Sequence, residues 1–130
     1  MRILLTEDDD SVRAFVSRAL ELDGHTVETA CHGVEALDRL TETNGRFDLL
    51  VTDVKMPIMD GIALAHETAS NWPGMPILLM TGFADQRERA QDLANVIRDV
   101  VTKPFTLQQI REAVSDAVVE EKSGETDKAA

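Results

Sequence analysis

Five residues that could act as a nucleophile, as metal ligands or as charge-balancing groups each follow a short segment that reads as a strand. They are Glu7 and Asp8 after residues 3–6, Asp53 after 49–52, Thr81 after 77–80 and Lys103 after 98–102. The first three of these segments are mainly apolar, and apolar runs of this length are typical of buried strands. In an open α/β sheet, ligands bind in the crevice outside the carboxyl ends of the strands. We therefore expect these five side chains to meet in one crevice.

Three carboxylates in one crevice require a cation. Two like charges about 4 Å apart cost about 4 kcal/mol at an effective dielectric constant near 20. Hard oxygen ligands suit Mg²⁺, which commonly bridges carboxylates to a phosphoryl group. With the cation in place, the Asp53 carboxylate can attack phosphorus. Lys103 would balance the charge, and the Thr81 hydroxyl would donate to a phosphoryl oxygen.

The elements that must position these residues alternate along the chain. Strands are expected over 3–6, 25–30, 49–52, 77–80 and 98–102, each followed by a helix, and apolar residues at helical spacing mark all of these helices except the fourth. The fourth helix, over 84–93, carries little apolar surface. Right-handed crossovers then give an α/β, flavodoxin-like, doubly wound five-stranded parallel sheet of order 2-1-3-4-5 with five helices.

Each of the chemically active residues also has a simpler explanation. Asp53, Glu7 or Asp8 alone could cap a helix, although Asp9 or Asp10 could cap the first helix equally well. Asp60 and Gly61 fit a turn better than a ligand set. The position of all five residues at the ends of expected strands favours a common site.

Composition limits the function classes. The chain has 130 residues and a net charge of -11, with no basic run that would suit the nucleic-acid backbone. Cys31 is the only cysteine, so no internal disulfide or cysteine zinc site is expected. No signal peptide or membrane-spanning run is visible, and we expect a cytoplasmic protein of one domain over 1–119. The polar residues 120–130 are expected to form a disordered acidic tail.

The chain resembles the receiver domain of two-component response regulators over roughly residues 2–119. Four motifs carry the resemblance, in the family's order: Ile3-Leu4-Leu5-Thr6-Glu7-Asp8-Asp9, Asp53-Val54-Lys55-Met56-Pro57-Ile58-Met59-Asp60-Gly61, Thr81-Gly82 and Lys103-Pro104-Phe105. The resemblance implies phosphorelay signal transduction. In this process, Asp53 takes a phosphoryl group from a histidine kinase or a histidine phosphotransferase, and the domain catalyses its own phosphorylation and dephosphorylation without being a conventional enzyme.

The resemblance also implies the metal ligands. Mg²⁺ is expected on Asp8, Asp53 and the main-chain carbonyl of Lys55, with Glu7 assisting through water. A cis peptide bond is expected before Pro104.

Two positions depart from the family's pattern. Glu7 stands where many receivers have Asp, so its direct ligation of the metal is doubtful. Val100 stands where many receivers carry an aromatic residue that moves on activation. Any switching is therefore expected to depend on Thr81, Gly82, Phe83 and the weakly anchored helix that follows them.

Two other function classes remain open at this point. An aspartyl phosphohydrolase of the haloacid dehalogenase type would need a general-acid Asp two residues after the nucleophile, and that residue is Lys55. A binding module that takes up no phosphate would be expected to have lost the acceptor or the lysine, and the chain has both.

The output is less defined than the site. No output domain follows residue 119, so a stand-alone receiver is expected. It would act by phosphorylation-dependent protein contact, as a monomer or a weak dimer through the fourth helix, fifth strand and fifth helix. Short segments are similar to CpdR-like protease-adaptor receivers and to receivers of hybrid kinases, so a protease adaptor or a kinase is a candidate output partner. No contact with nucleic acid or membrane is expected.

Overall fold

The computed structural model describes residues 1–82 and 96–129, with side chains described up to residue 118. Five strands and four helices lie in this part of the chain: β1 Arg2–Thr6, α1 Asp10–Leu22, β2 Thr26–Ala30, α2 Gly33–Glu42, β3 Leu49–Asp53, α3 Gly61–Asn71, β4 Ile77–Thr81, β5 Asp99–Thr102 and α5 Leu107–Ala129. The predicted fourth helix, over 84–93, and Phe83 lie outside the described residues.

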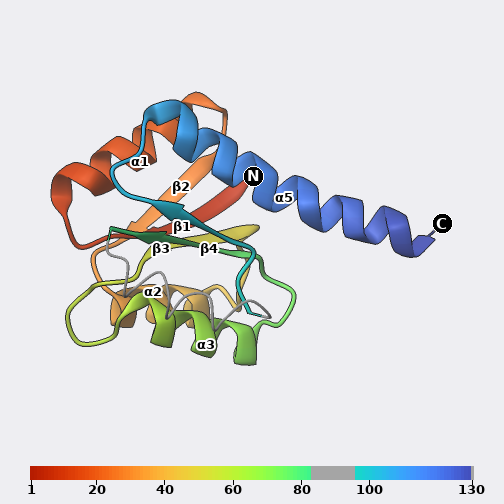
Figure 1. Ribbon diagram of the computed structural model, residues 1–130. Coiled ribbons are helices and arrows are strands. Elements are labelled where there is room, and N and C mark those ends of the chain that lie inside the picture. Colours follow the sequence, from red (N-terminus) through yellow and green to blue (C-terminus); the bar gives the residue numbers. More distant parts are fainter. Residues whose placement is uncertain (83–95, 130) are drawn as a thin grey trace.

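The five strands form one parallel sheet of order β2-β1-β3-β4-β5, which confirms the predicted order (Figure 1). The three inner strands follow from their sequences, because each contains an unbroken apolar run, and all their residues except Arg2 are buried. The outer strands β2 and β5 are partly exposed. In this strand order, the four strands that lead to the predicted site residues are neighbours: β1, β3, β4 and β5.

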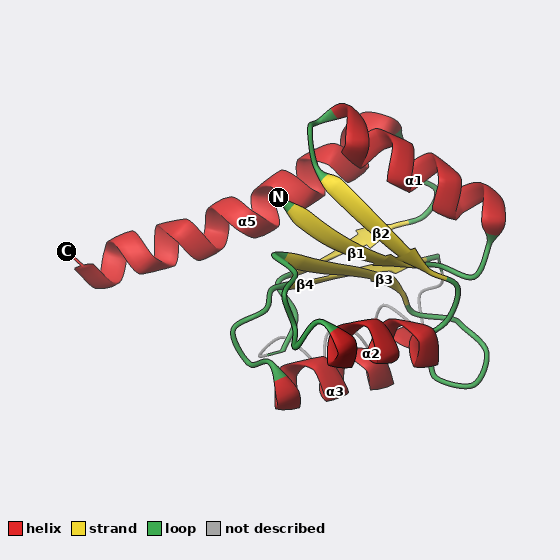
Figure 2. Ribbon diagram, turned by 180° about the vertical axis from the view of Figure 1, so that it is seen from behind, coloured by secondary structure: helices red, strands yellow, loops and turns green. Residues whose placement is uncertain are grey.

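Helices cover both faces of the sheet. Figures 1 and 2 show α1 and α5 on one face and α2 and α3 on the other. Alternation along β1 divides its side chains between two cores: Ile3 and Leu5 pack beneath α1 and α5, whereas Leu4 packs toward α2 and α3. Fully buried aliphatic side chains fill both cores. This dense packing holds the strands firmly in place where they end at the carboxyl edge of the sheet.

The helices that begin near the carboxyl edge have side-chain caps. Asp9 accepts from the Val12 N–H at the start of α1, so Asp9 rather than Asp10 is the cap. Asp60 accepts from the Ala63 N–H at the start of α3. These contacts satisfy amides that helix geometry leaves without partners. They also agree with the expectation that Asp60 serves the turn.

Helix α5 is longer than the sequence predicts. A disordered tail was expected from residue 120, but the backbone is helical as far as Ala129 and extends past the sheet (Figure 1). Within the described part of the chain, no helix is long and apolar enough to cross a membrane.

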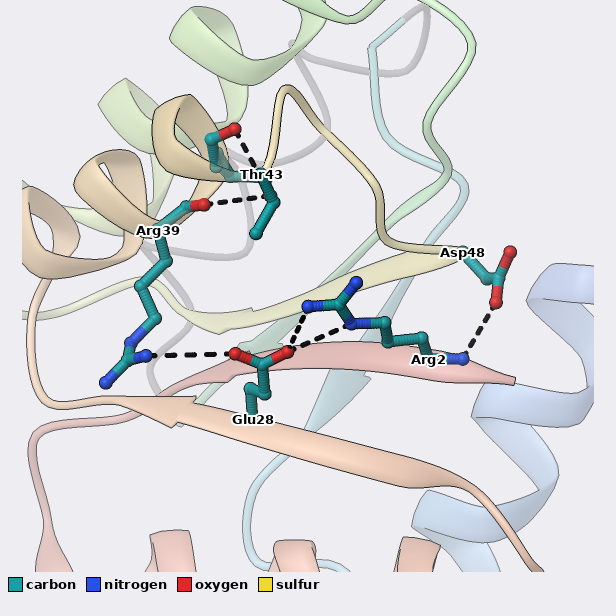
Figure 3. A network of polar contacts seen from close by, with 6 residues as sticks. Arg2, Glu28, Arg39, Thr43 and Asp48 are labelled. Atoms are coloured by element: carbon teal, nitrogen blue, oxygen red, sulfur yellow. Dashed lines mark hydrogen bonds and ion pairs between the residues drawn. The ribbon is translucent and has the colours of Figure 1, made fainter.

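At the amino edge of the sheet, opposite the predicted site, charged side chains connect neighbouring elements (Figure 3). Arg2 Nε and Nη2 donate to Glu28 Oε2 at 2.9 and 2.5 Å, and Arg39 Nη1 lies 3.7 Å from Glu28 Oε1. The Arg2 N–H donates to Asp48 Oδ2 at 2.7 Å. The network therefore connects β1, β2, α2 and the approach to β3. Because the pairs are partly exposed, each should contribute only about 0–1 kcal/mol.

Candidate functional site

The predicted carboxylates converge at the carboxyl edge of the sheet. Glu7 and Asp8 directly follow β1, and Asp53 is the last residue of β3, the neighbouring strand. One carboxylate oxygen from each of the three residues lies within 4.8 Å of the others. Glu7 is fully buried, Asp53 is nearly so, and Asp8 is exposed. The cluster is therefore closed on the protein side and open to solvent at Asp8.

Lys103 reaches the same cluster from beyond β5. Its Nζ lies 2.5 Å from Glu7 Oε1 and 3.1 Å from Asp53 Oδ1. Its main-chain N–H donates to the carbonyl of Thr81 at 2.7 Å, which fixes the end of β5 beside the end of β4. The peptide bond between Lys103 and Pro104 is cis, the isomer that the family resemblance implied.

Burial and charge act in opposite directions on Glu7 and Lys103. Burial raises the pKa of Glu7 to about 7, and the hydrogen bond from Lys103 only partly opposes this rise. For Lys103, burial acts to lower the pKa, but the Glu7 hydrogen bond and the nearby carboxylates outweigh it, so the pKa is raised. Lys103 therefore stays protonated beside the carboxyl groups of Glu7 and Asp53.

A divalent cation fits this arrangement. The cluster offers three carboxylate groups against the single ammonium of Lys103, so it carries excess negative charge when ionised. Carboxylate oxygens are hard ligands that suit Mg²⁺, an ion that keeps several waters and needs only one or two protein carboxylates. The exposed side chain of Asp8 leaves room for those waters and for a substrate oxygen.

The loop after Asp53 folds tightly against the end of β3. The Gly61 N–H donates to the Val54 carbonyl at 2.8 Å, and a Cβ atom at Gly61 would lie 2.0 Å from the main-chain oxygen of Asp53. The sequence marked Pro57 and Gly61 as turn residues, but this steric requirement depends on the three-dimensional approach. Gly61 therefore keeps the helix start close beneath the acceptor residue.

Arg13 is a site-supporting residue that the sequence reasoning missed. Its Nη1 donates to the main-chain carbonyl of Glu7 at 2.9 Å, and its Nη2 pairs with Asp10 at 2.5 Å. The available signal was the position of a basic residue in the first turn of the helix that follows the acidic run. Arg13 thus ties α1 to the loop that presents Glu7 and Asp8.

The remaining predicted residues take different positions. Thr81 is fully buried at the end of β4, and Val100 lies in β5 and packs against the core beneath α2 and α3. Lys55 is exposed two residues after Asp53. Gly82 is the last described residue before the gap, and a Cβ atom there would make an ordinary contact with Lys103. The roles assigned to these four residues stay predictions.

Comparison with known proteins agrees with this geometry. The family model for the response regulator receiver domain matches residues 3–115. The response regulator MprA of Mycobacterium avium is 39% identical over 110 residues, which are 85% of this chain and 47% of MprA. The sensor kinase CckA of Brucella abortus is 37% identical over 114 residues, which are 88% of this chain and 12% of CckA. The chain therefore spans less than half the length of these two relatives.

A solved structure shows the same fold. The response regulator TrrA of Thermotoga maritima, in complex with Mg²⁺-BeF, superimposes with a TM-score of 0.78 and 27% identity, over 89% of this chain and 97% of TrrA. The parallel sheet order, the acidic cluster beside Lys103 and the match over residues 3–115 agree with one another. The chain belongs to the response regulator receiver domain family.

Proposed function

We propose that this protein is a phosphorylation switch in which Asp53 accepts a phosphoryl group from a phosphohistidine. The observation that carries the proposal is the cluster of Glu7, Asp8 and Asp53, with Lys103 Nζ 3.1 Å from the acceptor carboxylate. As a receiver domain, the protein is a phospho-accepting signalling module rather than a conventional enzyme. We place the end of the receiver near residue 119.

Mg²⁺ is the cofactor that this site requires. Asp8, Asp53 and the main-chain carbonyl of Lys55 would hold it, with Glu7 acting through water. When bound, Mg²⁺ neutralises charge on the transferring phosphoryl group. The relative TrrA was solved with Mg²⁺-BeF, which supports the same ion here.

The chain's own residues supply the rest of the reaction. An oxygen of the Asp53 carboxylate attacks phosphorus as the bond between phosphorus and the donor imidazole nitrogen breaks. The electron pair of that bond leaves with the nitrogen. Lys103, held beside Asp53, would offset charge on the phosphoryl oxygens, and the Thr81 hydroxyl would donate to one of them. Release follows when water displaces the phosphoryl group from Asp53.

Phosphorylation would be transmitted through Thr81, Gly82 and Phe83. Val100 packs against the core, and its small aliphatic side chain cannot replace an aromatic residue that alternates between two positions. We therefore assign the switching motion to the segment that begins at Gly82. Finding that segment unchanged on binding of a phosphoryl mimic would exclude this assignment.

The partners follow from the family at a coarse level. Receiver domains partner with histidine kinases, and one relative of this chain is a sensor kinase. A cytoplasmic kinase domain or a histidine phosphotransferase would be the donor. A protease adaptor or a kinase is the output partner that short segments of the sequence favour, with contact through the face that includes β5 and α5, as a monomer or a weak dimer.

Incubation with a small phosphodonor and Mg²⁺ tests the proposal. The expected product is an acid-stable, hydroxylamine-labile phosphoryl label that is absent from Asp53→Ala. Steady turnover of the donor without a protein-bound label would instead indicate a phosphohydrolase. The absence of both would indicate a module that acts by contact alone.

A further inference from the structure

A hollow of about 460 Å³ lies at the amino edge of the sheet, between the loops that lead into the neighbouring strands β3 and β4. The loop before β3 contributes Phe47 and Asp48 to its wall, and the end of α3 with the loop before β4 contributes Asn71, Trp72 and Met75. We call this space the β3–β4 hollow. It lies at the edge of the sheet opposite the acidic cluster, so the proposed phosphorylation does not use it.

The walls of the β3–β4 hollow are fixed by main-chain contacts. The Trp72 N–H donates to the Thr68 carbonyl at 2.8 Å, and the Trp72 carbonyl accepts from the Met75 N–H at 3.1 Å. The Trp72 ring packs on Gly45, where a Cβ atom would lie 2.3 Å from Trp72 Cδ1. On the other wall, Phe47 is buried, and its N–H donates to the Gly45 carbonyl at 2.8 Å. The hollow is therefore formed before a ligand enters, as is usual for small-molecule sites.

The polar side chains of the hollow offer acceptor atoms. Asp48 Oδ2 accepts from the Arg2 N–H at 2.7 Å, and Figure 3 shows the second carboxylate oxygen directed away from Arg2. Asn71 Nδ2 donates to the Glu67 carbonyl at 2.9 Å, which leaves Oδ1 to accept from a ligand. Of the described residues that line the hollow, none is basic. The site is therefore suited to a ligand that donates hydrogen bonds and carries positive charge.

The aromatic side chains suit the same kind of ligand. A cation within about 6 Å of the face of a Trp or Phe ring is attracted to it, and Trp attracts it most strongly. One such contact already exists at this edge, because the Arg2 guanidinium carbon lies 4.7 Å from the centroid of the Phe47 ring. The charge of Arg2 is balanced by Glu28, which limits its repulsion of a second cation. The net charge of -11 adds a general attraction for cations.

We propose that the β3–β4 hollow binds a primary ammonium group on a short alkyl chain. The ammonium group would donate to the Asp48 carboxylate and to Asn71 Oδ1, and the alkyl chain would lie along the Trp72 ring. A free aliphatic amine and a lysine side chain share this chemistry. The site is separate from Asp53, so the proposal stands or falls independently of the proposed function.

Three probes of similar shape and different charge, n-butylammonium, n-butanol and butyrate, test the proposal. Trp72 is the only tryptophan in the chain, so its indole N–H signal in NMR reports on the hollow. At constant ionic strength, n-butylammonium should shift this signal saturably. n-Butanol should bind at least about threefold more weakly, and butyrate should not bind. The absence of a saturable shift, or equal or tighter binding of n-butanol or butyrate, would overturn the proposal.

A pair of substitutions separates the carboxylate of the hollow from the charge of the whole chain. Asp48→Asn should weaken n-butylammonium binding about threefold to fivefold, while the Asn oxygen can still accept from the Arg2 N–H and preserve the loop. Asp38→Asn removes the same charge from an exposed position on α2 and should leave the affinity unchanged. Equal weakening by the two variants would assign the effect to net charge and overturn the proposal.

A last comparison distinguishes the two sources of the ammonium group. Titration with putrescine and with N-acetyl-lysine methylamide should shift the Trp72 signal in both cases and shift it less in Asp48→Asn. Tighter binding of putrescine would identify a free amine as the ligand, and tighter binding of the lysine compound would identify a lysine side chain. Binding of neither compound would overturn the proposal.

Discussion

At Gly61 the absence of a side chain is a steric requirement of the acceptor loop. A Cβ atom would lie 2.0 Å from the Asp53 carbonyl oxygen and 3.0 Å from the Val54 Cα, both of them main-chain atoms that cannot move independently of β3. Gly61→Ala should therefore lower the free energy of unfolding by about 2–4 kcal/mol and displace Asp53 from Lys103. Urea denaturation measures the first effect, and phosphodonor labelling measures the second.

Gly74 provides the control for that substitution. It is exposed, its backbone is not left-handed, and a Cβ atom there would contact nothing within 4 Å. Gly74→Ala should leave stability within about 0.5 kcal/mol of the wild type or slightly raise it. An equal loss of unfolding free energy in the two variants would show that the close main-chain approach at Gly61 does not make its substitution more destabilising.

Ile58, in the same loop, stores backbone strain. It has a φ of 70°, a conformation unfavourable for a β-branched residue, and its side chain is 88% exposed. Ile58→Asn should raise the free energy of unfolding by about 0.5–1.5 kcal/mol, because Asn tolerates the left-handed region and little buried surface is lost. Thermal and urea unfolding would check this, and a lower stability would contradict the account of the loop.

The sequence was most informative about which residues do chemistry and least informative about how they contact one another. Glu7, Asp8, Asp53 and Lys103 were predicted because each lies at the end of an expected strand, and parallel strands bring such ends together. The pairing of Lys103 with both Glu7 and Asp53 depends on side-chain reach across the sheet, and no spacing in the sequence encodes that reach. The contact of Arg13 with the Glu7 carbonyl was missed for the same reason.

Among the elements, the packing of α5 against α1 includes an ion pair. Arg111 Nε and Nη2 both donate to Asp23 Oδ1 at the end of α1, and the hydrogen bond from Arg111 lowers the pKa of Asp23. A lowered pKa in the folded state means that the pair stabilises the fold above the unfolded pKa of Asp, near 3.9. That contribution disappears as the pH falls through the folded pKa.

Asp23→Asn should therefore lower the urea midpoint at pH 7 by a small amount. The difference from the wild type should close once the pH falls below the lowered folded-state pKa of Asp23, where the carboxyl is protonated in both states. A double-mutant cycle with Arg111→Gln isolates the pair from the capping position of Asp23. A difference that persisted at low pH would assign the effect to the cap and not to the ion pair.

Strand order could be predicted because each inner strand contains an unbroken apolar run and the connections are long enough for helices. Element ends were less predictable. Helix α5 continues to Ala129 through a polar segment that contains Gly124 but no proline. The composition of that segment argued for disorder because it cannot bury apolar surface, and that reasoning does not address local helix formation.

At the scale of the whole molecule, the acidic cluster couples folding to cation binding. An ion that binds only the folded state raises the free energy of unfolding, by about 2.7 kcal/mol at a hundredfold excess over its Kd. Mg²⁺ should therefore raise the unfolding temperature of the wild type, and a chelator should reverse the effect. Asp8→Asn should abolish most of the increase, whereas Asp38→Asn, a substitution of an exposed residue on α2, should not change it.

Direct identification of the modified residue tests the central claim. After incubation with a small phosphodonor and Mg²⁺, borohydride reduces an aspartyl phosphate to homoserine, which peptide mass spectrometry locates in the chain. The account predicts homoserine at position 53, dependent on Mg²⁺ and greatly reduced in Lys103→Met. Homoserine at Asp8 or Asp60, or an unmodified position 53 under conditions in which another receiver domain is labelled, would contradict it.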